Sequence, residues 1–123
     1  MATIADRVLD NGLTVLDTEA NRVDITSQES TTFAEATSTH TLGNATSITI
    51  SAPADRTGGG RKVTLSAISN GTVTGTGNAT NYAITDTNNS RLLVTGSLTA
   101  SQSVTSGNTF SLESLDIGIP DPS

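Results

Sequence analysis

The chain has 123 residues, the size of one domain with a single hydrophobic core. Only 33% of the residues are hydrophobic and 2% are aromatic, so the core has to be built from Val, Ile, Leu and Ala rather than from rings. The net charge of −6 and the scattered basic residues argue against a nucleic-acid partner, and the lack of cysteine excludes disulfides, thiolate metal sites and a cysteine nucleophile.

Threonine and serine make up nearly a third of the chain, with 23 Thr and 15 Ser. Thr is β-branched and suits a pleated surface, whereas many Ser and Thr with few apolar residues are also typical of a disordered or stalk-like segment. Apolar and polar residues alternate cleanly along several stretches. This alternation favours a folded, mainly β protein.

The N-terminal residues run from Met1 through Ala-Thr-Ile-Ala to Asp6, without the basic segment and apolar run of a signal peptide. No stretch of the chain reaches the length of a membrane span. We therefore expect a protein that is made in the cytoplasm, carries no export signal and has no membrane partner.

Residues 5–20 carry two competing signals. The Asn11-Gly12 pair is a strong hairpin cue, but pairing the chain about it mixes apolar and polar residues on each face. Wound as a helix, the same stretch places four apolar residues on one stripe: Leu9, Leu13, Leu16 and Ala20. We predict a short amphipathic helix with Asp6 in its first turn, weakened by about 1 kcal/mol by Gly12 in its interior.

A strand is predicted next at residues 23–26, followed by a long polar excursion from Ser27 to Asn44. Phe33 is the only large anchor of this excursion, and one helical turn is expected at residues 33–36. A loop of that length in a compact domain usually has a role, often contact with another molecule.

Residues 46–52 are the next predicted strand, with Ile48, Ile50 and Ala52 pointing inward. Pro53 ends it, and residues 54–60, with three consecutive glycines, form a turn. The stretch 61–68 then has the clearest period-two pattern in the chain, with Val63, Leu65 and Ala67 on one side and Lys62, Thr64 and Ser66 on the other. We predict that it is the central strand of the domain.

Beyond residue 68, turn signals at Asn70-Gly71, at 75–78, at 87–90 and at Asn108 separate further strands. These strands are predicted around Val73, at 81–86 and 91–95 as a hairpin, from 98 to 104, at 110–112 and at 115–119. About seven or eight short strands separated by such turns predict a β-sandwich or jelly-roll-like domain at residues 21–119. An N-terminal arm of residues 1–20 precedes it, and an exposed tail of residues 120–123 follows.

Candidate chemical groups are few. His40, the only histidine, lies in the polar excursion with no acidic or serine partner at a catalytic spacing, so we interpret it as a loop residue. Residues 58–62, Gly-Gly-Gly-Arg-Lys, lack the spacing of a phosphate-binding loop and precede a strand, which favours a plain turn. We predict no catalytic residue and no cofactor.

Acidic residues form two sets that offer oxygen ligands: Asp24, Glu29 and Glu35, and separately Asp55, Asp86 and Asp116. Neither set has the alternating pattern of a calcium loop, so we expect solvated charges and no metal site. Three triplets match the N-glycosylation motif, at Asn44, Asn70 and Asn78. Chance matches are expected in a chain so rich in Thr.

A series of motifs extends over nearly the whole chain. It comprises Asn-Arg-Val-Asp-Ile-Thr-Ser-Gln-Glu at 21–29, Thr-Thr-Phe-Ala-Glu-Ala-Thr-Ser-Thr at 31–39, Leu-Gly at 42–43, Gly-Arg-Lys-Val-Thr at 60–64, Asn-Ala-Thr-Asn-Tyr-Ala-Ile at 78–84, Arg-Leu-Leu at 91–93, Thr-Ser-Gly-Asn at 105–108 and Ile-Gly-Ile-Pro-Asp-Pro at 117–122. As an ordered series, these motifs resemble a small protein of tailed-bacteriophage structural gene clusters. In size and β-rich character, such proteins are similar to capsid decoration, or cement, proteins.

The resemblance implies a structural role in the virion, with no catalytic residues to carry over. The expected partners are the major capsid protein or other virion proteins, together with further copies of this chain as a homo-oligomer on the head. Many weak contacts act together on such a lattice. We expect residues 1–20 or the excursion at 27–44 to supply the contact that stabilises the head from outside.

Two other classes remain open at this stage. A tail, tail-fibre or head–tail junction component would have the same composition. A carbohydrate-binding module is less expected, because such modules present aromatic faces to sugar rings and this chain has one Tyr, two Phe and no Trp. An enzyme is the least expected class, for want of a nucleophile paired with a base.

Overall fold

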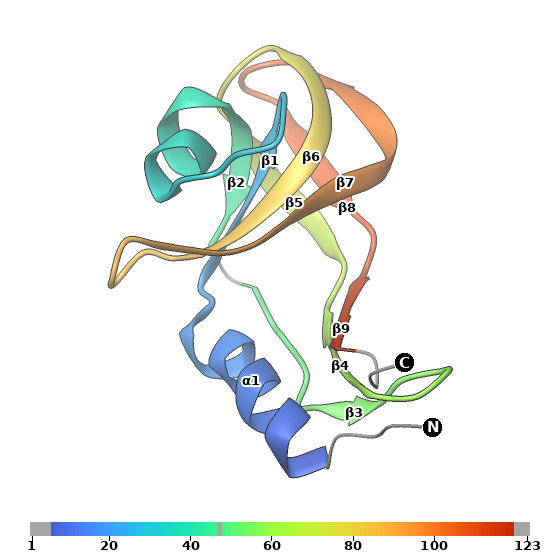
Figure 1. Cartoon of the computed structure of the whole chain (residues 1–123). Helices are drawn as coiled ribbons and strands as arrows, with labels where there is room; N and C mark the ends of the chain where they lie inside the picture. The colour runs from blue at the N-terminus through green and yellow to red at the C-terminus, as the bar shows by residue number, and fades with distance from the viewer. Residues whose placement is uncertain (1–5, 47, 120–123) are drawn as a thin grey trace. The chain divides into compact units, whose positions relative to one another are not determined.

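The computed structural model describes residues 6–46 and 48–119, with the backbone alone for residues 6–10 and 99. The protein is mainly β, with a short N-terminal helix and antiparallel sheets, as predicted (Figure 1). This arrangement is compatible with the predicted β-sandwich.

The described residues fall into two compact units. Unit 1 contains residues 6–19, 49–67 and 113–119, and unit 2 contains residues 20–48 and 68–112. Each unit is assembled from segments that are distant in sequence. The predicted division at residues 20 and 119 stays a prediction, and the predicted tail at 120–123 lies outside the described residues.

Unit 1 combines helix α1 (Asp6–Glu19) with a three-stranded antiparallel sheet in the order β3-β4-β9. Its strands are β3 (Ala54–Asp55), β4 (Arg61–Leu65) and β9 (Leu115–Ile119). The helix, rather than the hairpin, is therefore confirmed for residues 6–19. Leu13 and Leu16 of the predicted stripe are buried, whereas Ala20 lies beyond the helix end; the side chains of Asp6 and Leu9 lie outside the described residues.

Gly12 lies in the interior of α1, where it lowers helix stability. A Cβ atom at this position would meet the Cδ1 atom of Ile119 at 3.5 Å, an ordinary van der Waals contact. We therefore expect Gly12→Ala to raise the free energy of unfolding by up to about 1 kcal/mol, because Ala loses less backbone entropy in a helix. Urea unfolding followed by far-UV circular dichroism measures this, and a lowered midpoint would contradict it.

The alternation predicted around Val63 is confirmed within β4, where Val63 and Leu65 are fully buried and Lys62 and Thr64 are partly exposed. The prediction of one strand through residue 68 is wrong. β4 ends at Leu65, Ala67 is exposed, and Ile68 begins a strand of unit 2. β4 is central in the small sheet of unit 1 only.

Unit 2 contains a six-stranded antiparallel sheet in the order β7-β6-β1-β2-β5-β8. The strands are β1 (Arg22–Thr26), β2 (Thr41–Ala45), β5 (Ile68–Val73), β6 (Gly77–Asp86), β7 (Arg91–Val104) and β8 (Thr109–Leu112). β1 lies inside this sheet, between β6 and β2, and its residues Val23 to Thr26 are all fully buried. A strand that is buried on both faces belongs to the centre of the core.

The six-stranded sheet bends strongly along its edge strand β7. Ser97 pairs with Asn81, and Gln102 pairs with Ala79. Between these two pairs, β7 therefore has more residues than β6. Such a bulge bends its strand, and β7 arches across the unit toward β8 (Figure 1). The Gln102 Nε2 atom donates to the Ser111 carbonyl at 2.9 Å, which links the two edge strands.

Three sequence predictions for this region are wrong, and each has a physical reason. The polar excursion ends at His40, because Thr41 to Ala45 form β2 between β1 and β5. Residues 48–52 form no strand: Ile50 makes an isolated bridge with Leu65, and Ala52 is exposed. Asn70 and Gly71 lie within β5 rather than in a turn, because Gly71 faces a ring on the neighbouring strand.

Candidate functional site

The connection between β1 and β2, residues 27–40, is the first candidate contact surface. It contains a π-helix, η1 (Glu35–Thr39), and so confirms a helical turn near the predicted position. The backbone N–H and the hydroxyl of Thr31 both donate to Oε1 of Glu35 at 2.8 Å. The N–H of Glu35 in turn donates to the Thr32 hydroxyl at 3.1 Å. Glu35 thus accepts from Thr31 and donates to Thr32, which resembles a helix capping box shared between two threonines and fixes the start of the turn.

The capping bonds also act on the Glu35 carboxylate. Hydrogen bonds from the backbone N–H and then the hydroxyl of Thr31 hold the pKa of Glu35 below its ordinary value. Glu35 therefore stays ionised and keeps its acceptor role at neutral pH. The connection is built by its own polar side chains, a feature that hydrophobic patterning does not reveal.

His40 closes the other end of this connection. Its Nε2 atom lies 2.6 Å from the Gln28 side-chain nitrogen and its Nδ1 atom lies 3.2 Å from the Ser30 hydroxyl. Both ring nitrogens of His40 therefore have a side-chain partner within the connection.

Sequence spacing did not reveal the Ser30 partner of His40, because ten residues separate the two in the chain. Ser30 is only 3% exposed, whereas His40 is half-buried. The Ser27 N–H also donates to the His40 carbonyl at 3.0 Å. His40 therefore fixes the connection to the ends of β1 and β2, which agrees with its interpretation as a loop residue.

The outer side of the connection consists of small polar and apolar groups. Phe33, the predicted anchor, is only half-buried, and the buried apolar residue of the connection is Ala36. The exposed side chains of residues 31–39 belong to Thr31, Thr32, Ala34, Ser38 and Thr39. This surface has fixed backbone geometry and short side chains that lose little entropy on binding.

The second candidate is a surface pocket of unit 1 with a volume of about 360 Å³. The described residues that line it are Arg56, Thr57, Lys62, Asp116 and Gly118. It adjoins the glycine turn at 58–60, where all three φ angles lie between 90° and 104°. Only glycine adopts this backbone at low cost, so the conformation of the turn needs its three glycines.

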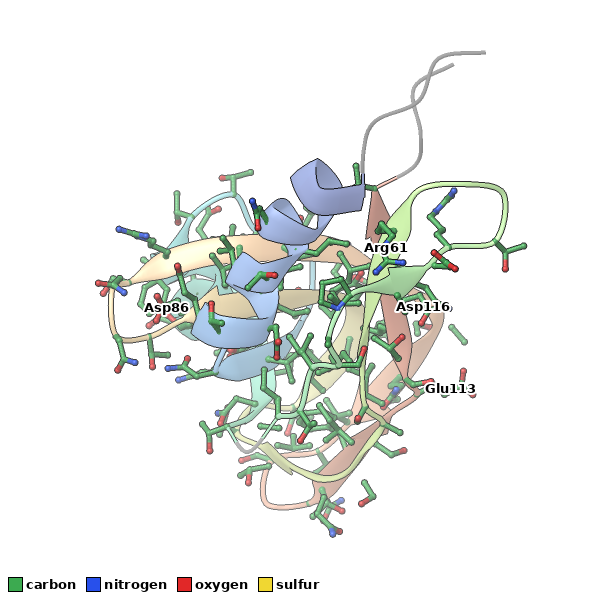
Figure 2. The ribbon with its side chains drawn as sticks, turned by 90° about the horizontal axis from the view of Figure 1, so that it is seen from below. Arg61, Asp86, Glu113 and Asp116 are labelled. Carbon is green, nitrogen blue, oxygen red and sulfur yellow. The ribbon has the colours of Figure 1, made fainter. Side chains whose placement is uncertain are left out.

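Asp116 is the acidic residue among the described residues that line this pocket. Its Oδ1 atom accepts from the Thr64 hydroxyl at 2.7 Å, and its Oδ2 atom accepts from Lys62 Nζ at 3.0 Å. Both partners lie on β4, which pairs with β9, the strand of Asp116. Figure 2 labels Asp116. The Thr64 hydrogen bond, followed by Lys62, lowers the pKa of Asp116.

A depressed carboxyl pKa predicts a definite pH dependence. The stabilisation from ionised Asp116 is complete above its unfolded pKa of about 3.9 and is lost as the pH falls through the lower folded pKa. We expect Thr64→Val to move the Asp116 titration midpoint upward, and Lys62→Met to move it less. The ¹³C resonance of the Asp116 carboxyl carbon measures the midpoint, and an unchanged midpoint in Thr64→Val would contradict the assignment.

The prediction of solvated charges for the two acidic sets is wrong for Asp24 and Asp86, because both side chains are buried and hydrogen-bonded. Asp24 is bound by Arg22 through two bonds of 2.7 and 2.8 Å. Asp55 pairs with Arg61 at 2.6 Å. Asp86 caps the β6–β7 turn by accepting from the Asn88 N–H and the Asn89 amide. Within the described part of the chain, no group of three His, Cys, Asp or Glu residues lies close enough to hold a metal ion.

The glycosylation triplets all lie in strands: Asn44 in β2, Asn70 in β5 and Asn78 in β6.

Over residues 6–46 and 48–119, no helix has the length and apolar character to cross a membrane. No protein-family model, curated protein or solved structure matches this chain.

Proposed function

We propose that this protein is a structural component of a tailed-bacteriophage virion, a capsid decoration protein that binds the outside of the assembled head and stabilises it. The observation that carries the proposal is the ordered series of motifs from residue 21 to residue 122, with its resemblance to phage structural proteins. The β-rich fold with antiparallel sheets supports the proposal, because it provides a rigid body for repeated contacts.

The contact surface is the connection at residues 27–40, in preference to the N-terminal helix. The connection presents exposed Thr, Ser and Ala side chains on a backbone that its own hydrogen bonds fix. A preorganised surface loses little conformational entropy when it binds. A polar surface with short side chains also suits a decoration protein, because such a protein binds a head that has already assembled.

Helix α1 is a weaker candidate for the shell contact. Leu13 and Leu16 are 2% and 7% exposed, so its apolar face is already buried within unit 1. To lie on a neighbouring subunit, the helix would have to expose both leucines first, at a cost of about 1.5 to 3 kcal/mol for each side chain. Among the described side chains of the helix, residues 11–19, Val15 is the large apolar one that is exposed.

A carbohydrate-binding role has little support from the aromatic residues. The ring of Phe110 is buried, and Tyr82 lies half-buried against Gly96 of the paired strand. The buried ring of Phe110 offers no face on which a sugar ring could stack, and Gly96 lies against the ring of Tyr82. The remaining alternative, a tail or head–tail junction protein, differs from a decoration protein in location alone.

The test is a cryo-EM map of purified particles of the phage that encodes this chain. We expect density of this fold repeated across the icosahedral shell. Density along the tail or at the portal vertex alone would replace decoration with the tail alternative. Absence of the chain from purified virions, measured by mass spectrometry, would overturn the virion proposal itself.

A binding assay tests the contact surface separately. Ser38→Arg places a long charged side chain on exposed η1, and we expect it to weaken binding to particles that lack the protein. Ser69→Arg adds the same side chain at an exposed position of β5 and serves as the control. Equal binding of both variants would move the contact away from residues 27–40.

A further inference from the structure

The pocket of unit 1 contains an arginine whose best hydrogen-bonding edge is unused. Arg56 is partly buried, and its Nη1 atom donates to the Gly59 carbonyl at 3.1 Å. Within the described residues, its Nε and Nη2 atoms have no acceptor. These two atoms form the edge of a guanidinium that binds a carboxylate through two parallel bonds.

The same protein shows what this edge does when an acceptor is present. Arg22 uses Nε and Nη2 to bind the two oxygens of Asp24 at 2.7 and 2.8 Å. Arg56 is one of the residues that line a 360 Å³ pocket, and it has the same pair of donors. The volume is large enough for the end of an acidic side chain or a chain terminus rather than a single water molecule.

The backbone around Arg56 is shaped to hold its side chain in place. A Cβ atom at Gly118 would lie 2.9 Å from Arg56 Cδ and 3.0 Å from Arg56 Nε, closer than real side chains pack. Because Gly118 of β9 has no side chain, it leaves room for the side chain of Arg56. On the other side, Arg56 N–H donates to the Gly60 carbonyl at 3.2 Å, so the glycine turn fixes the backbone of the arginine.

The charge of the pocket favours a monoanion. Asp116 already accepts from Thr64 and Lys62, so both of its oxygens are engaged within the protein. Among the described residues that line the pocket, one side chain is acidic (Asp116) and two are basic (Arg56 and Lys62), which sums to a charge of about +1. A carboxylate balances this charge, whereas a phosphate dianion would leave an excess negative charge beside Asp116.

We propose that this pocket binds a carboxylate of a protein partner, held by the Nε and Nη2 atoms of Arg56 with Lys62 as a second donor. The pocket lies on the face of the β3-β4-β9 sheet that carries Lys62 and Thr64, because neighbouring residues of a strand point to opposite faces and Val63 and Leu65 point the other way. The inference does not rest on the virion role.

The experiment is an NMR titration of the ¹⁵N-labelled full-length chain with sodium acetate, with sodium chloride added to keep the ionic strength constant. We expect saturable shifts of the Arg56 Nε–H resonance and of the Lys62 and Gly118 amides. An acetylated Asp-containing tripeptide should produce the same shifts at lower concentration. Shifts that grow linearly with acetate and do not saturate would overturn the proposal.

Variants separate the pocket from general charge effects. Arg56→Gln should weaken acetate binding by roughly tenfold or more, since it removes a charge-assisted bidentate contact. Gly118→Ala keeps every charge but fills the space beside Arg56, and it should also weaken binding. Arg91→Gln removes an exposed arginine of unit 2 and should leave binding unchanged.

Two results would contradict the assignment. Equal affinity of Arg56→Gln and the unchanged protein would remove Arg56 from the site. Inorganic phosphate at pH 8, where the dianion predominates, should bind more weakly than acetate; tighter phosphate binding would overturn the carboxylate assignment. Because the titration uses the free chain, its failure leaves the virion proposal standing, and loss of virion location leaves this site standing.

Discussion

Arg22→Met is expected to lower the free energy of unfolding of unit 2 by about 3 to 5 kcal/mol. The reason is the environment of Asp24, whose side chain is fully buried in β1 and bound by Arg22 through two short bonds. After the substitution, the carboxylate keeps the Thr41 hydroxyl at 2.6 Å as a partner but loses its counter-charge. A buried charge without a counter-charge is far more costly than a broken surface ion pair.

Urea unfolding followed by tyrosine fluorescence measures this effect, since Tyr82 is the only tyrosine, there is no tryptophan, and β6 belongs to unit 2. Lys62→Met is the matched control, because it breaks an ion pair in which Lys62 and Asp116 are 30% and 56% exposed. Since Lys62 belongs to unit 1, both variants are also followed by far-UV circular dichroism, which reports on both units. We expect it to change the free energy of unfolding by about 1 kcal/mol or less. Equal effects of the two substitutions would show that Asp24 does not depend on Arg22.

The double variant Arg22→Met with Asp24→Leu tests the cause more closely. It removes both charges and fills the buried site with an apolar side chain. We expect it to be more stable than Arg22→Met alone, because replacing a whole buried ion pair with apolar groups is often neutral. A double variant that is as unstable as the single one would indicate that shape, and not charge, decides the cost.

The sequence predicted those elements whose pattern is local. The stripe containing Leu13 and Leu16 identifies α1, and the alternation of Val63 and Leu65 identifies β4, because each pattern matches the period of its element. The β6–β7 hairpin was also predicted, since residues 87–90 are typical turn residues. In each case the decisive signal lies within a few residues.

The parts that the sequence did not predict depend on contacts between distant residues. β1 reads as a half-polar strand, yet Asp24 and Thr26 are buried because Arg22, Thr41 and the Gln28 carbonyl satisfy them. The pocket of unit 1 brings the turn after β3 next to β9, about sixty residues later in the chain. No spacing rule connects Arg56 to Gly118.

Gly71 is the clearest case of a residue whose role depends on a distant partner. Sequence analysis interpreted Asn70-Gly71 as a turn, but Gly71 pairs with Phe110 in the ladder of β5 and β8. A Cβ atom at Gly71 would overlap the Cε1 and Cζ atoms of the Phe110 ring. The ring also covers Gly43 on β2, where a Cβ atom would lie 3.1 Å from it. The ring of Phe110 therefore packs against the backbone of both glycines, where a side chain would take its place.

We therefore expect Gly71→Ala to destabilise unit 2 by about 3 kcal/mol, since Phe110 is 3% exposed and has to move within a packed core. Gly75→Ala is the control, because the nearest atom to its Cβ would be 3.5 Å away. By itself, Phe110→Leu should lower the free energy of unfolding. In the Gly71→Ala background, the same substitution should raise it and recover part of the loss. This change in the sign of the effect is the signature of a direct contact. Additive effects in the double-mutant cycle would show that the alanine acts through the backbone of β5 and not through the ring.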